Sequence, residues 1–196
     1  YPYLPEGIYA DLREAVSSRE RIVKELNAIT NRIKRWLKIY FPEYLVVYKN
    51  FSAESGLTVL ETVPLPQDIV QLGPEGVNQL WRDKKLRAVG MKRALTLVEA
   101  AHNSIGLPGG NCARMEIQLL LEDFRTKQSQ LEMITEVLEE ETLSVPYADK
   151  LLAIKGVGLI TVAGFLAEVG DIRRFDSPKQ IQKLAGLEVK ENSSGK

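Results

Sequence analysis

Hydrophobic residues recur at steps of three and four through two long stretches of the chain, which predicts two long amphipathic helices. The first stretch ends at Pro42, and a capping-box pattern at Ser17–Glu20 predicts its start. Its apolar positions are Ile22, Leu26, Ile29, Ile33, Trp36 and Tyr40. The second stretch runs from about Cys112 to Glu141, with a seam of Ile117, Leu121, Phe124, Gln128, Leu131, Ile134 and Leu138. Seams of this kind are typical of coiled-coil-like packing.

The region between these helices has a less regular pattern. Tyr44–Tyr48 is short, apolar and β-branched, so it predicts a strand or an extended connection. Prolines and glycines separate short helical pieces at Gln67–Leu72 and Glu75–Arg82, and a further helix is expected over Lys84–Ser104. The pattern therefore predicts a mainly α-helical chain in two parts. Residues 1–144 form a helical, coiled-coil-like region, and residues 145–196 form a small helical domain.

Near the C-terminus one apolar helical pattern stops at Gly156-Val157-Gly158 and another begins at once. Two glycines so close together allow unusual backbone torsions and leave no side chains over the amides that open the second helix. Such amides bind phosphate oxygens, and Lys155 and Thr161 add a cation and a hydroxyl beside them. The pattern predicts a helix–hairpin–helix that binds a nucleic-acid backbone. A tight connection between two bundled helices, without any ligand, fits the glycines equally well.

Charge changes this picture through its distribution. The chain has 26 Lys and Arg and 26 Asp and Glu, so its net charge is zero, yet the first long helix is basic and the second is acidic. A basic face beside an apolar seam suits phosphate contact on one side and packing on the other. A merely solvated charged face is the alternative. Two helices of opposite net charge are expected to pack against each other, within one chain or between the chains of a homo-oligomer.

Other features limit the classes of chemistry. No apolar run approaches the roughly 18 residues that a membrane span needs, so no membrane partner is expected. One cysteine, Cys112, excludes an internal disulfide framework and fits a reducing cytosol. Together with a single histidine, His102, it leaves no zinc site within one chain, and no metal ligands are predicted here.

The order of six short C-terminal motifs resembles the insertion-sequence "one-ten" transposases, also called bridge-RNA-guided recombinases. The motifs are Gly-Val-Gly (156–158), Glu-Val-Gly-Asp (168–171), Arg-Phe (174–175), Ser-Pro-Lys-Gln (177–180), Leu-Ala-Gly-Leu (184–187) and Ser-Ser-Gly-Lys (193–196). The resemblance extends more weakly over Tyr1–Phe41 and the second long helix, which look like that family's linker and coiled coil.

The resemblance implies DNA strand exchange through a serine nucleophile. Ser194 matches the family's catalytic serine, and Ser193 is the neighbouring candidate. The residues expected to bind nucleic acid are Lys155, Gly156, Gly158, Thr161, Lys179, Lys183, Lys190 and Lys196. DNA, a guide RNA and a second copy of the chain are the implied partners, in the cytoplasm of a bacterium or archaeon and associated with the nucleoid.

The resemblance also implies parts that this sequence does not contain. A nuclease domain with acidic magnesium ligands is expected before Tyr1, and a basic segment is expected after Lys196. We therefore expect no cofactor in this fragment and no transposase activity from it alone. Two other classes stay open: a non-catalytic helix–hairpin–helix DNA-binding module, and a helical dimerisation scaffold that binds no nucleic acid.

Overall fold

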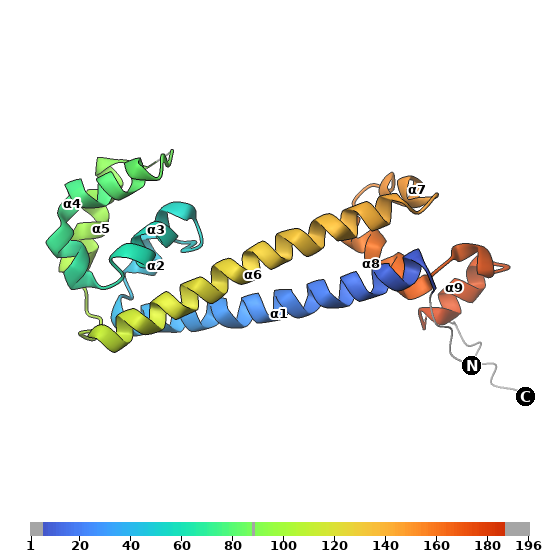
Figure 1. The fold of residues 1–196 in the computed structure, drawn as a ribbon, viewed down its shortest axis with the longest axis horizontal. Helices are drawn as coiled ribbons and strands as arrows, with labels where there is room; N and C mark the ends of the chain where they lie inside the picture. The colour runs from blue at the N-terminus through green and yellow to red at the C-terminus, as the bar shows by residue number, and fades with distance from the viewer. Residues whose placement is uncertain (1–5, 88, 187–196) are drawn as a thin grey trace, which may run out of the picture. The chain divides into compact units, whose positions relative to one another are not determined.

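The computed structural model describes residues 6–87 and 89–186, and their regular structure is entirely helical (Figure 1). The helices are α1 (Ile8–Tyr40), α2 (Tyr44–Val47), α3 (Glu54–Thr62), α4 (Pro66–Asp83), α5 (Met91–His102), α6 (Asn111–Leu143), α7 (Ala148–Leu152), α8 (Leu159–Val169), the 3₁₀ turn η1 (Ile172–Arg174) and α9 (Pro178–Leu184). The prediction of a mainly α-helical chain with two long helices is confirmed.

Packing divides the chain into two units. The central unit is Lys24–Ser129, and the terminal unit combines Tyr1–Val23 with Gln130–Lys196. Each long helix contributes one part to each unit. These two units are defined by packing and divide both long helices. The division of the chain into domains 1–144 and 145–196 stays a prediction.

Helix α1 begins at Ile8, so the helix start predicted at Ser17–Glu20 is wrong and the capping-box pattern lies inside the helix. The apolar period continues upstream of that pattern to Leu12 and Ala15, which are both buried. Burial of these side chains extends the helix toward its N-terminal end, because packing of an apolar face stabilises a helix more than a cap does.

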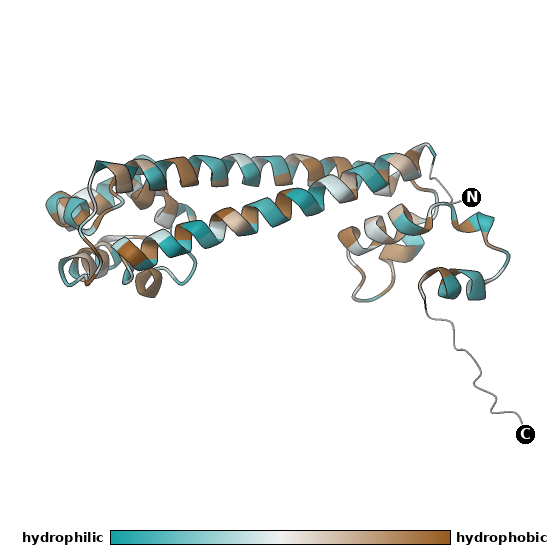
Figure 2. Cartoon of the chain, turned by 90° about the horizontal axis from the view of Figure 1, so that it is seen from below, coloured by the Kyte–Doolittle hydropathy of each residue, from teal (hydrophilic) through white to brown (hydrophobic). Residues whose placement is uncertain are grey.

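In the central unit the seams of the two long helices meet in one core. Ile33 and Trp36 of α1 are buried in the same cluster as Leu121 and Phe124 of α6. The indole N–H of Trp36 donates a hydrogen bond to the Ala113 carbonyl at 3.0 Å. Hydrophobic residues recur along both long helices (Figure 2), and the expectation that these helices pack as partners is confirmed within this unit.

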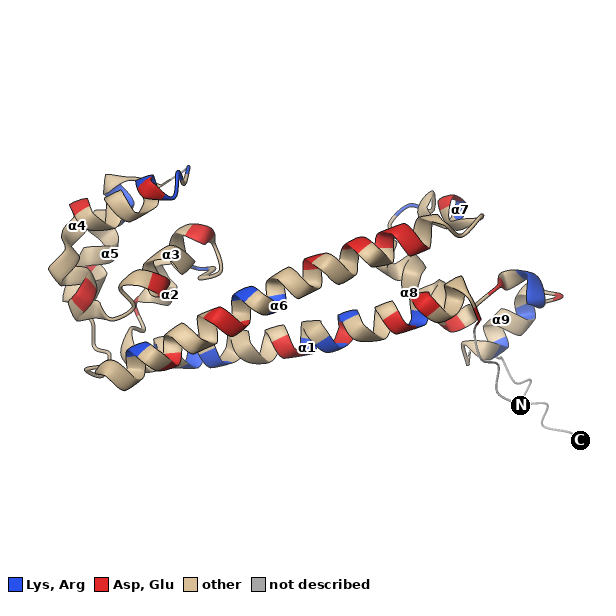
Figure 3. Ribbon diagram, viewed as in Figure 1, with Lys and Arg blue, Asp and Glu red and all other residues tan. Residues whose placement is uncertain are grey.

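The ion pair between these helices joins an acidic residue of the basic helix to a basic residue of the acidic helix, which is the reverse of what their net charges predict. Glu25 of the basic helix α1 pairs with Lys127 of the acidic helix α6 at 2.6 Å. Figure 3 shows that the acidic residues of α6 are concentrated toward its α7 end, which lies beyond the central unit. Apolar seams, rather than the opposite net charges of the helices, therefore account for the pairing in this unit.

Tyr44–Val47 forms the single-turn helix α2, so the prediction of a strand or an extended connection is wrong. The Tyr44 ring stacks on Tyr48 with 4.8 Å between centroids, and its hydroxyl donates to the Gly56 carbonyl at 2.7 Å. The described residues contain no strand with which an extended segment could pair. Burial of the two tyrosines stabilises the turn instead.

The two short helical pieces predicted at residues 67–72 and 75–82 are confirmed: they are the two parts of α4, which meet at a kink where Gly73 adopts a non-helical φ of 70 and ψ of 171. The next helix, α5, begins at Met91, so the prediction of a helix start at Lys84 is wrong. Residues after Asp83 form a connection instead, because Lys85 adopts φ 53 and ends α4.

A second core lies in the terminal unit. Leu12 of α1 and Leu138 of α6 are buried with Ala148 of α7 and with Val162 and Leu166 of α8. This core fixes the start of α7 and the inner face of α8, and it thereby positions the loop between them. None of the helices in the described ranges is both long enough and apolar enough to cross a membrane.

Candidate nucleic-acid interface

The loop between α7 and α8 contains Lys155, Gly156 and Gly158 of the predicted nucleic-acid-binding residues, and Thr161 lies in the first turn of α8. Gly156 adopts φ 87, a left-handed conformation that favours glycine. Gly158 is the N-cap of α8, with φ −98 and ψ 170. The amide of Val157 donates to the Ile154 carbonyl at 3.0 Å, which closes the turn. The loop therefore ends directly at the first amides of α8.

The N-terminus of α8 is open. The Gly158 carbonyl accepts hydrogen bonds from the amides of Thr161 and Val162 at 3.0 and 3.1 Å. The amides of Leu159 and Ile160 precede these bonds, and the first amides of a helix have no intrahelical acceptor. Gly158 offers no capping side chain, and the first turn contains no acidic residue. A β-carbon built at Gly158 would meet no atom within 4 Å, so the space beside this residue is open.

Two exposed side chains flank this end of α8. Lys155 lies in the loop, and Thr161 lies in the first turn of the helix. On the opposite side of the helix, Ala163 and Ala167 are buried in the terminal core. The buried face holds α8 in place, while the exposed face presents amides, a hydroxyl and a cation to solvent. This combination of groups binds an anionic oxygen of the size of a phosphate oxygen.

Helix α9 places the next two predicted residues, Lys179 and Lys183, one helical turn apart and exposed. Ser177 and Pro178 begin this helix as the sequence predicts, although the Ser177 side chain makes no capping hydrogen bond. A hollow of about 380 Å³ is lined by Phe165 and Glu168 of α8 and by Ile181 and Leu184 of α9. The two lysines are thus on a helix adjacent to α8 but outside its N-terminal loop.

Ser193, Ser194, Lys190 and Lys196 lie outside the described residues. Of the eight predicted nucleic-acid-binding residues, the structure brings Lys155, Gly156, Gly158 and Thr161 into one loop and helix start.

Between α8 and α9 the arginines of the Arg-Phe region are engaged locally. Arg173 makes a two-pronged ion pair with Asp171, with a shortest distance of 2.7 Å. Hydrogen bonds from the Arg173 side chain and backbone lower the pKa of Asp171. The Arg174 guanidinium donates to the Val169 carbonyl at 3.1 Å and lies 4.2 Å from the Phe175 ring centroid. These arginines stabilise the turn after α8.

Tyr147 is a positioning residue that the sequence pattern did not identify. Its hydroxyl accepts from the Ile172 amide at 3.2 Å and lies 3.4 Å from the Gly170 carbonyl. It also bonds the Tyr9 hydroxyl at 3.0 Å. Burial, followed by this hydrogen bond, raises the pKa of Tyr9 well above its ordinary value. No local pattern links positions so distant in sequence, so the contact emerges only from the fold.

In the part of the chain that the structure describes, no three His, Cys, Asp or Glu side chains gather as a metal site. Residues 148–196 match the family model described as "Transposase IS116/IS110/IS902 family". A comparison with curated proteins finds no match. The matched segment includes α7, the open loop, α8 and α9, and it is therefore similar to the corresponding segment of insertion-sequence transposases.

Proposed function

We propose that this chain belongs to a DNA transposase or recombinase that binds the nucleic-acid backbone and exchanges DNA strands through a serine nucleophile. The observation that carries this proposal is the transposase-family match over residues 148–196, which includes the open N-terminus of α8. Because DNA is the substrate of transposition, we propose that the anion bound at the N-terminus of α8 is a phosphate of the DNA backbone.

In this proposal the amides of Leu159 and Ile160 donate to one phosphate oxygen, and Lys155 offsets its charge. Thr161 adds a hydroxyl donor from the first turn. Lys179 and Lys183 of α9, with Lys190 and Lys196 beyond the described residues, contact further phosphates. Contacts of this kind position a protein on DNA without reading its sequence.

The proposed nucleophile is the hydroxyl oxygen of Ser194, with Ser193 as its neighbour. The serine oxygen forms a bond to phosphorus, the bond from phosphorus to a sugar oxygen breaks, and that oxygen takes up the proton that serine releases. The strand is then held as a phosphoserine ester. Attack by a sugar hydroxyl of a second strand reverses these steps and frees the serine. Each step exchanges one phosphate ester for another, so no external energy source is needed.

A guide RNA and a second copy of the chain are further proposed partners. The magnesium ions that the resemblance implies belong to a nuclease domain outside this sequence, so no step above is assigned to a metal.

The test is a recombination assay with a protein that contains the nuclease domain and the C-terminal basic segment. Ser194→Ala should abolish strand exchange and the covalent protein–DNA species while nearly preserving DNA affinity, because many phosphate contacts hold the surface. Ser193→Ala is the matched control and should be milder. Recombination by the Ser194→Ala protein would show that the nucleophile is another residue.

The alternative is a non-catalytic DNA-binding module, which the open α7–α8 loop favours because that geometry binds a phosphate without any nucleophile. Backbone binding without a covalent adduct in the complete protein would favour this alternative. A lack of salt-sensitive nucleic-acid binding would instead favour a helical scaffold.

A further inference from the structure

The connection between α4 and α5 in the central unit is strongly basic. Residues 82–93 contain six basic residues and a single acidic residue, Asp83. The basic residues are Arg82, Lys84, Lys85, Arg87, Lys92 and Arg93. Figure 3 shows blue residues gathered where α4 ends and the chain turns toward α5. We call residues 82–87 and 89–93 the basic connection.

Lys85 has a backbone conformation that a lysine disfavours. It adopts φ 53, and it is the one non-glycine residue with positive φ among the described residues. Its amide donates to the Arg82 carbonyl at 2.8 Å, and the Leu86 amide donates to the Trp81 carbonyl at 2.9 Å. This pair of bonds is the Schellman motif that ends many helices, and glycine is the usual residue at the left-handed position. Strained non-glycine residues cluster at functional sites.

Both ends of the basic connection are fixed to the core. Trp81 is fully buried, and its indole N–H donates to the Ser55 carbonyl at 2.9 Å. At the other end the Arg93 guanidinium lies 4.5 Å from the Tyr48 ring centroid and donates to the Val47 carbonyl at 3.4 Å. Lys84 pairs with Glu61 at 3.1 Å. These four contacts hold the two ends of the segment against the core.

The remaining cations face solvent. Arg82, Lys85, Arg87 and Lys92 are exposed, and within residues 6–87 and 89–186 none of them forms an ion pair with a carboxylate. Four like charges on a short, anchored segment repel one another, and that repulsion is relieved when they neutralise a polyanion.

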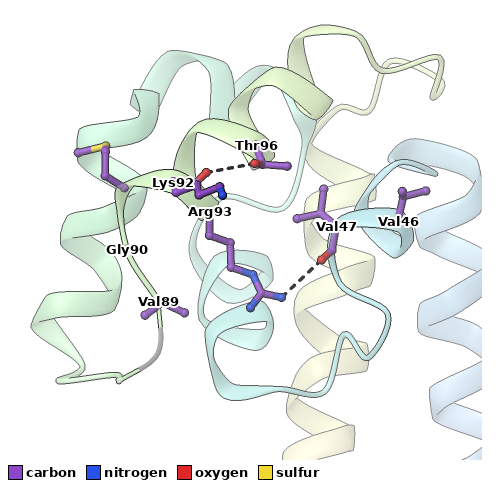
Figure 4. A pocket seen from close by; sticks show the side chains of 8 residues that line it. Val46, Val47, Val89, Gly90, Lys92, Arg93 and Thr96 are labelled. Carbon is purple, nitrogen blue, oxygen red and sulfur yellow. Dashed lines mark hydrogen bonds between the residues drawn. The ribbon is translucent and has the colours of Figure 1, made fainter.

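An open hollow of about 690 Å³ lies beside this segment (Figure 4). Its lining includes Val46 and Val47 of α2 and, from the basic connection, Val89, Lys92 and Arg93. Apolar valines form much of one wall, and Val46 is 78% exposed. A hollow with an apolar wall and cations at its edge accommodates the sugar and phosphate of a nucleic-acid strand.

We propose that the basic connection is a second binding surface for the backbone of duplex DNA, separate from the α7–α8 loop. The choice of DNA rests on the proposed function. Residues 82–93 contain no aromatic residue, whereas proteins that bind single-stranded RNA or DNA stack bases on exposed aromatic rings. A surface of cations without such rings contacts phosphates and is indifferent to sequence.

The test measures the affinity of the full chain for a labelled mixed-sequence DNA duplex over a range of salt concentrations. One variant combines Arg82→Ala, Lys85→Gly, Arg87→Ala and Lys92→Ala. The charge-matched comparison combines Arg32→Ala, Lys34→Ala, Arg35→Ala and Lys38→Ala, four exposed cations on the basic face of α1, which is the competing candidate for phosphate contact in the same unit. Each lost phosphate contact should lower the slope of log K against log salt by about 0.9, so the first variant should lose up to about 3.6. The comparison variant should lose much less.

Lys85→Gly alone separates function from folding. It removes a cation and relieves the strained backbone, so the chain should unfold at a higher temperature and yet bind the duplex about two- to fivefold more weakly. A misfolded variant could not produce that combination. Equal losses from the two quadruple variants, an unchanged slope, or binding of structured RNA in place of duplex DNA would overturn the proposal.

Parallel measurement of Gly158→Asp distinguishes the two surfaces. If Gly158→Asp weakens binding and the basic-connection variant does not, this second surface is refuted and the proposed α7–α8 interface stands. If only the basic-connection variant weakens binding, the second surface is supported and the proposed role of the α8 N-terminus is refuted.

Discussion

Replacing Gly158 by aspartate and, separately, by asparagine tests the open N-terminus of α8 with two side chains of nearly the same shape. Gly158 is the N-cap of α8 at φ −98 and ψ 170, a conformation that any residue adopts. A β-carbon at this position meets no atom within 4 Å. Both substitutions should therefore fold, and both side chains should cap the first amides of the helix.

The two variants differ in one charge. Aspartate and asparagine are among the best N-cap residues, so each should stabilise the chain by a few tenths of a kcal/mol over glycine. The aspartate carboxylate then occupies the place proposed for a phosphate oxygen. Two like charges about 4 Å apart repel by about 1 kcal/mol in bulk water and about 4 kcal/mol near a protein surface. A loss of about 1.5–3 kcal/mol, or about 10- to 150-fold in DNA affinity, is expected.

Asparagine also covers the amides but carries no charge, so Gly158→Asn should weaken binding less than Gly158→Asp. Fluorescence anisotropy with a DNA duplex measures both affinities, and thermal unfolding checks that both chains are folded. Glu141→Ala on the acidic helix α6 is a distant control and should leave the affinity nearly unchanged. Wild-type affinity in the Gly158→Asp chain, with its fold intact, would refute the phosphate site.

Two further predictions concern association and stability. If the chain self-associates, as its seams predicted, the responsible surface should include the exposed Leu119 rather than the buried Leu121. Light scattering should then detect a smaller species for Leu119→Glu, and a monomeric wild-type chain would contradict the prediction. Hydrogen bonds from Arg125 lower the pKa of Glu54, so this ion pair stabilises the chain above the ordinary carboxyl pKa of 4.5 and is lost as the pH falls through the lowered value. Arg125→Gln should lower the unfolding temperature by about 2–4 °C near neutral pH, for a loss of about 1 kcal/mol at this partly exposed pair, and by less at about pH 3.

The long helices could be predicted from sequence because their period repeats over many turns. Ile33, Trp36, Leu121 and Phe124 occupy predicted seam positions, and all are buried. The start of α1 could not be predicted, because Ser17–Glu20 has local capping chemistry that burial of residues further upstream overrides.

Within the candidate site, the α7–α8 loop could be predicted because its residues are neighbours in sequence. The basic connection could not be predicted, because the hydrophobic pattern over Lys84–Ser104 fits a helix. The end of α4 is set by a left-handed lysine, a conformation that residue type alone does not predict. Tyr147 contacts Tyr9 and Ile172 across the fold of the terminal unit, and long-range hydrogen bonds of this kind have no local pattern.

Two helix ends in this chain carry a residue that is not the best choice for the helix itself. At the N-terminus of α8, Gly158 stands where serine, aspartate or asparagine caps better. At the C-terminus of α4, Lys85 stands where glycine fits the left-handed backbone better. Stability alone explains neither residue.

A polyanionic ligand explains both departures with one cause. A capping carboxylate at position 158 would repel a phosphate, and a glycine at position 85 would remove a cation that attracts one. Departures from local preference are expected where function requires them. If this reasoning is correct, Gly158→Asp and Lys85→Gly should each give a chain that is more stable and binds DNA less tightly. The two substitutions lie in different units, one at the N-terminus of α8 and the other at the C-terminus of α4.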